Sequence, residues 1–145
     1  MSVGHDAPYR PRPRLTALTE PYWTAGRDGV LRIQRCDACG YYVHPPGPVC
    51  PRCHARTLTF SAVSGRATVM TATVNHQPWY PGWPSTYVVA IVELDEQPGL
   101  RLTTNLVGDI PADPIGARVQ VQFVESEGIW LPLFAAVLAT TVTSP

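Results

Sequence analysis

Two closely spaced pairs of cysteines are the residues whose types and spacing most clearly imply a chemistry. Cys36 and Cys39 form one Cys-x-x-Cys pair, and Cys50 and Cys53 form a second pair after ten intervening residues. Four thiolates are the number that a tetrahedral structural zinc requires, and the two-residue spacing lets both sulfurs of a pair reach one ion. The spacing therefore predicts one structural zinc site, with iron as the substitute that four thiolates can also hold.

Other roles for the cysteines fit the sequence less well. Disulfides are disfavoured because the chain shows no secretory signal, and a redox dithiol normally uses a single pair in a strand–helix–strand setting. His44 and His54 lie close enough in sequence to compete as ligands, but four cysteines already complete the site. A closed four-thiolate site leaves no open position for water or substrate, so its expected role is to fold a segment that lacks a core.

A catalytic set of residues is not evident elsewhere in the sequence. It contains no nucleophile elbow, phosphate-binding loop, dinucleotide fingerprint or His-Glu-x-x-His motif. His76 is a conceivable general base, but no carboxylate near it in sequence would orient it. We therefore predict no catalytic residue and do not expect the chain to be an enzyme on its own.

Residues 76–86 form an unusual connection between two predicted strands, because they carry three large aromatic side chains among prolines and a glycine. These side chains are Trp79, Tyr80 and Trp83. Loops normally carry polar residues over the surface, so these rings need something to bury them. Two interpretations stay open: the loop plugs one end of a barrel, or its rings contact a partner or ligand, since tryptophan and tyrosine are enriched in interface hot spots.

The elements that must position these residues are mostly short strands, because 16 prolines exclude long helices. Alternating patterns predict strands at Val30–Arg35, Leu58–Val63, Ala67–Asn75, Tyr87–Leu94, Leu100–Leu106, Arg118–Glu125 and Ile129–Val137. A short helix bearing Tyr22 and Trp23 precedes them. The predicted fold is mainly β: a flexible arm at 1–18, a short helix and zinc ribbon at 19–57, and a small antiparallel OB-fold barrel at 58–140.

Length and composition indicate the class of protein and its expected cellular location. Its 145 residues suit one domain or two small ones, and 45% of them are hydrophobic, as in globular proteins. Apolar runs stay well short of the ~20 residues of a membrane helix, and the arginine- and proline-rich start has no apolar segment of a signal peptide. We therefore expect a cytoplasmic protein that binds no membrane.

A zinc ribbon next to an OB-fold also occurs in nucleic-acid-binding proteins, which is the alternative function. Residues 1–66 hold nine arginines and four acids, a net charge of +5, whereas residues 67–145 hold two arginines and seven acids, a net charge of −5. An OB barrel that follows a phosphate backbone needs a basic groove. The acidic barrel half therefore disfavours nucleic acid as a partner, while the basic front half suits a compact anion.

Several segments taken together resemble one protein family. They are Tyr22-Trp23, Leu31–Cys36, the paired cysteines, Pro45–Pro51, Val63–Val69 and Tyr87–Leu94. Over about residues 19–137 the chain resembles domain-of-unknown-function family 35, acyl-CoA-associated proteins with a rubredoxin-like zinc ribbon and a C-terminal OB-fold. The sequence departs from the family at His54, where the family often has glycine.

The resemblance implies a non-catalytic accessory subunit that helps to form the acyl-CoA site of a partner enzyme. Partners in the family are thiolase-fold enzymes, including thiolases, acyltransferases and the aldolases that shorten steroid side chains, and some members are fused to a hotdog-fold hydratase. The resemblance implies that Cys36, Cys39, Cys50 and Cys53 hold zinc. The contacts expected with the partner or acyl-CoA are Tyr22, Trp23, Arg35, Arg52, Arg56, Trp79, Tyr80 and Trp83.

Overall fold

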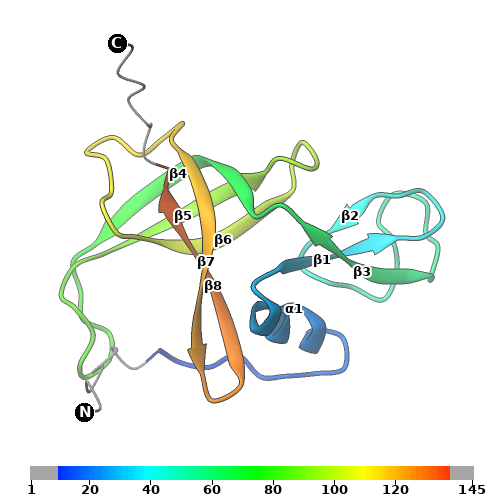
Figure 1. The fold of residues 1–145 in the computed structure, drawn as a ribbon, viewed down its shortest axis with the longest axis horizontal. Helices are drawn as coiled ribbons and strands as arrows, with labels where there is room; N and C mark the ends of the chain where they lie inside the picture. Colours follow the sequence, from blue (N-terminus) through cyan, green and yellow to red (C-terminus); the bar gives the residue numbers. More distant parts are fainter. Residues whose placement is uncertain (1–9, 138–145) are drawn as a thin grey trace, which may run out of the picture.

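Strands are the main regular structure of the fold (Figure 1). The structure is a computed structural model that describes residues 10–137. In chain order the elements are α1 (Glu20–Thr24), the 3₁₀ helix η1 (Ala25–Asp28), β1 (Leu31–Cys36), β2 (Tyr42–Val43), β3 (Leu58–Val63), β4 (Arg66–Asn75), β5 (Tyr87–Leu94), β6 (Arg101–Val107), β7 (Arg118–Ser126) and β8 (Ile129–Ala136). The ranges predicted for β3 and β5 are confirmed, and the other predicted strands differ by one residue at one end or, for β1 and β6, at both ends.

A three-stranded antiparallel sheet, in the order β2-β1-β3, carries the cysteine loops. β1 pairs with β3 along its whole length, from Leu31 opposite Val63 to Cys36 opposite Leu58. The sequence places β3 at the start of the OB-fold region 58–140, whereas the structure places it in this sheet and starts the barrel at β4. The reason is that the chain folds back on itself at the cysteine loops, which brings β1 and β3 together as neighbours.

Strands β4 to β8 form a closed barrel in the order β4-β5-β6-β8-β7. Its neighbouring strands are antiparallel except for β6 and β8, which run parallel at Leu106–Phe134 and Val107–Ala135. Five strands cannot alternate in direction around a closed ring, because five is odd, so one neighbouring pair must be parallel. The prediction of a mainly β protein with an OB-type barrel is confirmed, with this one pair as a correction.

One hydrophobic core joins the ribbon sheet to the barrel. Leu31 and Ile33 of β1 are fully buried in the same cluster as Phe134 of β8, and Tyr22 of α1 belongs to it too. Because alternate residues of a strand point to opposite faces, the alternation that predicts β1 also directs Leu31 and Ile33 to one side. The ribbon is therefore rooted in the barrel core rather than tethered by a linker.

The turn between β5 and β6 ties the ribbon sheet to the barrel through side chains. The amide of Gln97 accepts a hydrogen bond from the backbone N–H of Tyr42 at 2.8 Å and donates one to the Tyr42 carbonyl at 3.0 Å. In the same turn, Glu96 accepts a hydrogen bond from the backbone N–H of Ser64 at 2.7 Å. These contacts fix the orientation of β2 and of the β3–β4 connection relative to the barrel.

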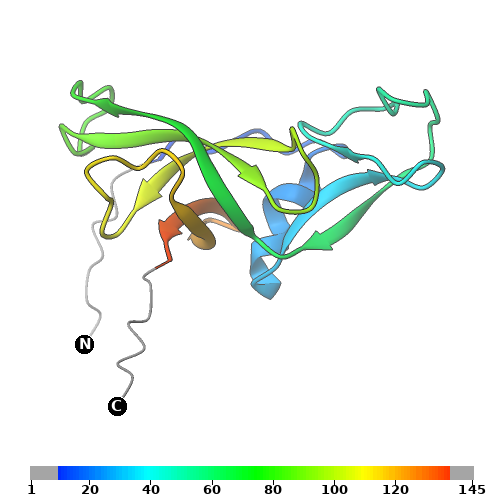
Figure 2. The same ribbon diagram turned by 90° about the horizontal axis from the view of Figure 1, so that it is seen from above.

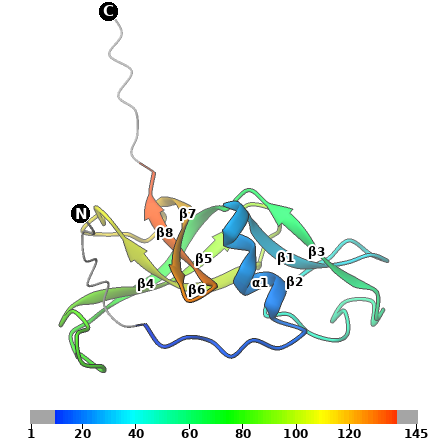
Figure 3. The same cartoon turned by 60° about the horizontal axis from the view of Figure 1, so that its bottom comes forward.

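The helical segment packs between the ribbon and the β7–β8 hairpin, while the cysteine loops project at the far end of the molecule (Figures 2 and 3). Gly26 of η1 is buried so closely that a Cβ atom there would lie 2.4 Å from Cδ1 of Phe123 and 2.6 Å from Cβ of Trp130. Gly29 ends the segment with φ +71°, a conformation that glycine adopts without strain. Residues 10–18 lie beside the barrel and lead into α1 (Figure 3).

Candidate functional site

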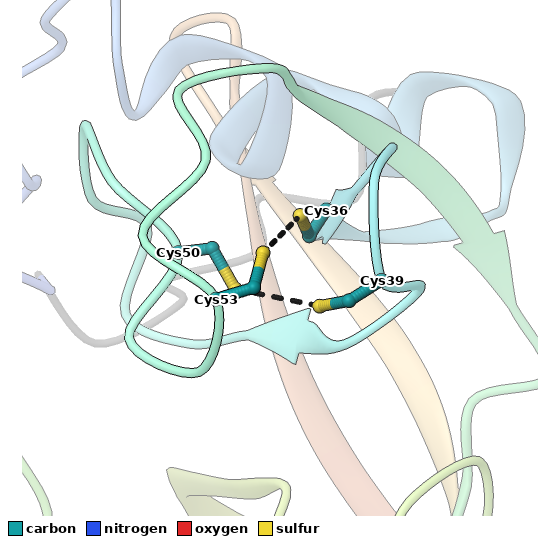
Figure 4. A group of neighbouring side chains, drawn as sticks. All are labelled: Cys36, Cys39, Cys50 and Cys53. Atoms are coloured by element: carbon teal, nitrogen blue, oxygen red, sulfur yellow. Dashed lines mark hydrogen bonds between the residues drawn. The ribbon is translucent and has the colours of Figure 1, made fainter.

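The four cysteines converge at the tip of the ribbon (Figure 4). The Sγ atoms of Cys36 and Cys53 are 3.6 Å apart, those of Cys39 and Cys50 are 3.7 Å apart, and all four lie within 4.8 Å of one another. Zinc–sulfur bonds of about 2.3 Å in a tetrahedron place the sulfurs about 3.8 Å from each other. The four thiols are free of disulfides and have the spacing of a tetrahedral metal site, so the structure supports metal binding here.

Matching backbone turns position the two cysteine pairs. Gly40 donates its N–H to the Cys36 carbonyl at 2.9 Å, and His54 donates its N–H to the Cys50 carbonyl at 2.9 Å. Gly40 has φ +75° and His54 has φ +63°, so both residues after a pair take the left-handed conformation. Glycine adopts this conformation without strain, whereas His54 adopts it with a side chain, which its exposed position accommodates.

The electrostatic setting of Cys50 favours its thiolate. Burial raises the pKa of the Cys50 thiol, but the backbone N–H groups of Cys53 and Arg52, together with hydrogen bonds from neighbouring cysteines, more than offset this and lower the pKa to about 7. The neighbouring sulfurs and burial in turn raise the pKa of Cys53. Because the thiolate is the metal-binding form of cysteine, the N–H groups around Cys50 favour binding of a cation there. In the described residues 10–137, the cysteines are joined by no further histidine or carboxylate ligand.

A zinc ion fits this donor set and would be held by Cys36, Cys39, Cys50 and Cys53. It would supply cross-linking of the two loops, since four protein ligands leave no position for a reacting water or substrate. Buried Gln34 supports the loop between the pairs by exchanging two hydrogen bonds of 2.9 Å with the backbone of Gly47. Four cysteine ligands on a hydrogen-bonded loop are the arrangement of a structural metal site.

The three ribbon arginines differ in whether contacts within the ribbon hold their side chains. Arg35 lies 4.8 Å over the ring of Tyr42 and donates a hydrogen bond from Nε to the Gly40 carbonyl at 2.9 Å. Arg52 lies 5.9 Å over the ring of Tyr41 and is exposed, as is Arg56. Arg35 is therefore engaged within the ribbon, whereas the other two present their charge to solvent.

The aromatic loop projects from the barrel as the β4–β5 connection (Figure 1). Trp79 is 65% exposed and Tyr80 is 44% exposed, so these rings do not plug the barrel. Trp83 is half-buried against the edge of Tyr87, with 4.9 Å between ring centroids. The indole N–H of Trp79 bonds to Asn75 Oδ1 at 3.1 Å, which steadies the ring in its exposed position.

The two aromatic residues of α1 face different surroundings. Tyr22 is 5% exposed and belongs to the core, and burial raises the pKa of its phenol. Its ring centroid lies 5.0 Å from that of His44, whose pKa falls from 6.5 to about 4 because of burial. Trp23 is half-buried, and its ring makes an edge contact with Tyr22 at 4.7 Å.

A groove on the outside of the barrel brings two of the expected contacts, Trp23 and Trp83, together with residues that the sequence does not single out. It has a volume of about 220 Å³, and its lining includes Trp23, Trp83, and Thr103 and Asn105 of β6. Arg10 also lines it. The outward positions of an alternating strand such as β6 indicate an exposed face, but nothing local in the sequence shows that Arg10 lies across it.

Comparison with known proteins identifies both parts of the chain. Residues 23–59 match the family described as ChsH2, rubredoxin-like zinc ribbon domain, and residues 61–124 match ChsH2, C-terminal OB-fold domain. A solved structure titled "Ltp2-ChsH2(DUF35) aldolase" is 37% identical with a TM-score of 0.78, over 88% of this chain and 100% of that chain. A DUF35-family protein of unknown function from Sulfolobus solfataricus shares the fold, with a TM-score of 0.60 at 14% identity over 83% of this chain and 86% of that one.

Two curated relatives are named as subunits. The "Probable enoyl-CoA hydratase alpha subunit" of Thermomonospora curvata is 39% identical over 86% of this chain and 39% of its own length. The "3-oxo-4,17-pregnadiene-20-carboxyl-CoA hydratase alpha subunit" of Mycobacterium tuberculosis is 35% identical over 79% of this chain and 36% of its own length. This chain thus spans less than two fifths of either relative. Among the described residues, no helix is long and apolar enough to span a membrane.

Proposed function

This chain belongs to the DUF35 family, with a ChsH2 zinc ribbon and a ChsH2 OB-fold as its two parts, and on that premise we propose that it is a non-catalytic accessory subunit of an acyl-CoA-processing enzyme. The likeness to the Ltp2-ChsH2(DUF35) aldolase carries the proposal, because it covers all of that chain. That title names a DUF35 protein together with a second component as an aldolase. The partner that we propose is a thiolase-fold enzyme.

The names of the curated relatives support the acyl-CoA class of substrate. Both are called alpha subunits of hydratases that act on CoA compounds, one of them a pregnadiene carboxyl-CoA. We therefore extend the proposal to acyl-CoA thioesters, steroid side chains among them, and to a hydratase as a further partner. The chain's own contribution is a scaffold held by zinc.

The aromatic loop is the surface that we assign to the partner enzyme. Trp79 and Tyr80 together expose large rings on a connection that also contains Pro78 and Pro81. Rigid aromatic side chains lose little conformational freedom on docking and often dominate interface energy. Arg52 and Arg56 on the ribbon are the exposed cations that suit the phosphates of an acyl-CoA.

Co-purification of the tagged chain with a thiolase-like enzyme of the same organism tests the proposal. We expect a stable complex, and Trp79→Ala should weaken it by about 2 kcal/mol or more, which is about a 30-fold rise in Kd. Ile115→Ala is the matched control, because Ile115 is 59% exposed on the separate β6–β7 connection. The unfolding free energies of both variants should equal that of the unaltered chain, since neither side chain packs in the core.

Two results would overturn the proposal. One is the absence of any complex between folded, metal-loaded chain and the thiolase-like enzyme. The other is acyl-CoA turnover by this chain alone at the rate of the mixture, which would make it the catalyst. Equal weakening by Trp79→Ala and Ile115→Ala would move the interface away from the aromatic loop.

A further inference from the structure

Strand β3 forms an outer edge of the ribbon sheet, since β1 is its only strand neighbour among the described residues 10–137 (Figure 1). The hydrogen-bond register shows which backbone groups of β3 point away from β1. Cys36 of β1 donates its N–H to the Tyr41 carbonyl on the β2 side at 2.9 Å. Because successive residues of an antiparallel strand direct their backbone groups to opposite edges, Arg35 points to β3, where it lies opposite Thr59. The outward N–H and C=O groups of β3 therefore belong to Leu58, Phe60 and Ala62.

Side chains satisfy the backbone groups around this open stretch but not those within it. At its barrel end, Ser64 donates its N–H to Oε1 of Glu96 at 2.7 Å and accepts a hydrogen bond from Gln120 at 3.1 Å. On the opposite edge of the sheet, Gln97 holds both backbone groups of Tyr42. Within residues 10–137, no hydrogen bond reaches the outward groups of Leu58, Phe60 or Ala62.

The side chains of β3 do not guard this edge. Proteins usually protect edge strands with charged residues, prolines, bulges or a covering element, because unpaired backbone groups bind other strands. Leu58–Val63 contains no charged residue and no proline, and its register with β1 runs without a bulge. Ala62 is exposed at the edge. An unguarded edge of this kind suits the addition of a strand from another chain.

A second copy of β3 fits the edge in an antiparallel arrangement. With a twofold axis at Phe60, Leu58 of each copy lies opposite Ala62 of the other, and every outward N–H meets an outward C=O. The two Phe60 side chains then lie directly opposite each other as a cross-strand aromatic pair. The pairing uses the open stretch alone and stops short of Ser64, whose backbone groups are already bonded.

Charges that flank the edge complement each other in this pairing. When the register is continued, Arg56 of one copy lies level with Ser64 of the other, next to the carboxylate of Glu96. Arg56 is exposed, and neither it nor Glu96 forms an ion pair within the described part of the chain. Oε2 of Glu96 is also buried without a hydrogen-bond partner among these residues. The neighbouring acid, Asp95, is already paired with arginines of its own chain.

We propose that two copies of this chain associate through β3, which joins their ribbon sheets into one continuous antiparallel sheet. The aromatic loop lies at the other end of the molecule (Figure 1), so each copy still presents it to a partner enzyme. Arg56 takes part in the pairing, and Arg52 remains as the exposed ribbon cation for acyl-CoA. The proposal goes beyond the accessory-subunit function, because it concerns association of the chain with itself.

Sedimentation equilibrium on the full-length, metal-loaded chain tests the proposal in the absence of any other protein. We expect a monomer–dimer equilibrium with a Kd of about 10–100 µM, because a single strand pair buries less area than a stable interface does. A chain that stays monomeric up to about 1 mM would overturn the proposal, since most of it should then be dimeric.

A proline at the edge separates pairing with a second copy from pairing within the chain. The N–H of Ala62 points outward, so Ala62→Pro removes one intermolecular hydrogen bond per copy and leaves the bonds to β1 in place. We expect the Kd for dimerisation to rise by about tenfold or more. Ala62→Val is the matched control, because it keeps the N–H and should leave the Kd within twofold. An equal Kd in the two variants would refute the pairing.

Charge reversal at Arg56 tests the register without altering the backbone, and it decides the question if Ala62→Pro lowers the unfolding midpoint. Arg56→Glu places a carboxylate next to Glu96 of the other copy, so the Kd should rise by about tenfold, counting both symmetric contacts. Arg14→Glu is the control, because Arg14 is an exposed arginine in the segment beside the barrel and should leave the Kd within twofold. Equal effects of the two charge reversals would contradict the register.

The edge could instead bind a strand of the partner enzyme, and the same variants recognise that outcome. A chain that is monomeric alone but loses its complex with a thiolase-like enzyme in Ala62→Pro, and not in Ala62→Val, would assign the edge to that enzyme and overturn the pairing of two copies. Because sedimentation uses this chain alone, its failure leaves the accessory-subunit proposal to its own co-purification test.

Discussion

Replacing Gly26 by alanine tests how tightly the helical segment is docked on the barrel. Gly26 lies in η1, and an added Cβ would come within 2.4 Å of Phe123 Cδ1, 2.6 Å of Trp130 Cβ and 2.7 Å of Phe123 Cγ. Such distances are shorter than carbon atoms tolerate, so either the Phe123 ring or the backbone of η1 must move. Gly26 is buried where η1 packs against the β7–β8 hairpin, and α1 directly precedes η1. The displacement therefore also shifts α1, which carries Trp23 at the groove.

The expected cost follows from two opposing terms. Overpacking a well-filled site typically costs about 1–3 kcal/mol. Alanine gains about 0.4–1 kcal/mol over glycine by restricting the unfolded chain. The net expectation for Gly26→Ala is therefore a loss of about 1–2 kcal/mol in the free energy of unfolding.

Urea unfolding of the metal-saturated chain, followed by tryptophan fluorescence, measures this loss. Gly47→Ala is the matched control, because the nearest atom to a Cβ there is the Val49 carbonyl oxygen at 4.0 Å. The control retains the unfolded-state gain without the overlap, so it should be unchanged or slightly stabilised. If Gly26→Ala unfolds at the same urea concentration as Gly47→Ala or a higher one, the helical segment is not docked as tightly as the structure shows.

Two further predictions concern the ribbon and its base. Cys39→Ser should abolish stoichiometric metal binding and expose the amides of residues 36–57 to hydrogen exchange. The amides of β1 should stay protected, because Leu31 and Ile33 lie in the barrel core. Equal loss of protection in the barrel, or unaltered protein purified without zinc or iron, would contradict this prediction. Burial lowers the pKa of His44 from 6.5 to about 4. As the pH drops, the unfolded chain therefore binds the proton before the folded chain does. The free energy of unfolding should fall between about pH 6.5 and pH 4, by about 3 kcal/mol at most. The difference in unfolding free energy between unaltered chain and His44→Gln should therefore vary with pH in this window and be flat above pH 7, and a difference that is constant throughout would refute this role for His44.

The metal centre and the strands could be predicted from the sequence because both depend on local spacing. Two residues between cysteines suffice to bring both sulfurs of a pair to one ion, and the structure brings both pairs within 4.8 Å. Period-two alternation marks strands such as Tyr87–Leu94 because successive side chains point to opposite faces. The family resemblance rests on the same local segments.

The tertiary structure alone decided which strands are neighbours and which side chains meet. β3 pairs with β1 rather than opening the barrel, and β6 runs parallel to β8 because five strands close the ring. Tyr22 is buried in the core and Trp23 is only half-buried, although they are adjacent in the sequence. Arg10 and Asn105, 95 positions apart, meet across the barrel face. Periodicity determines which face of an element is apolar, but contacts between distant residues depend on sheet order and docking, which are set by packing of the whole chain.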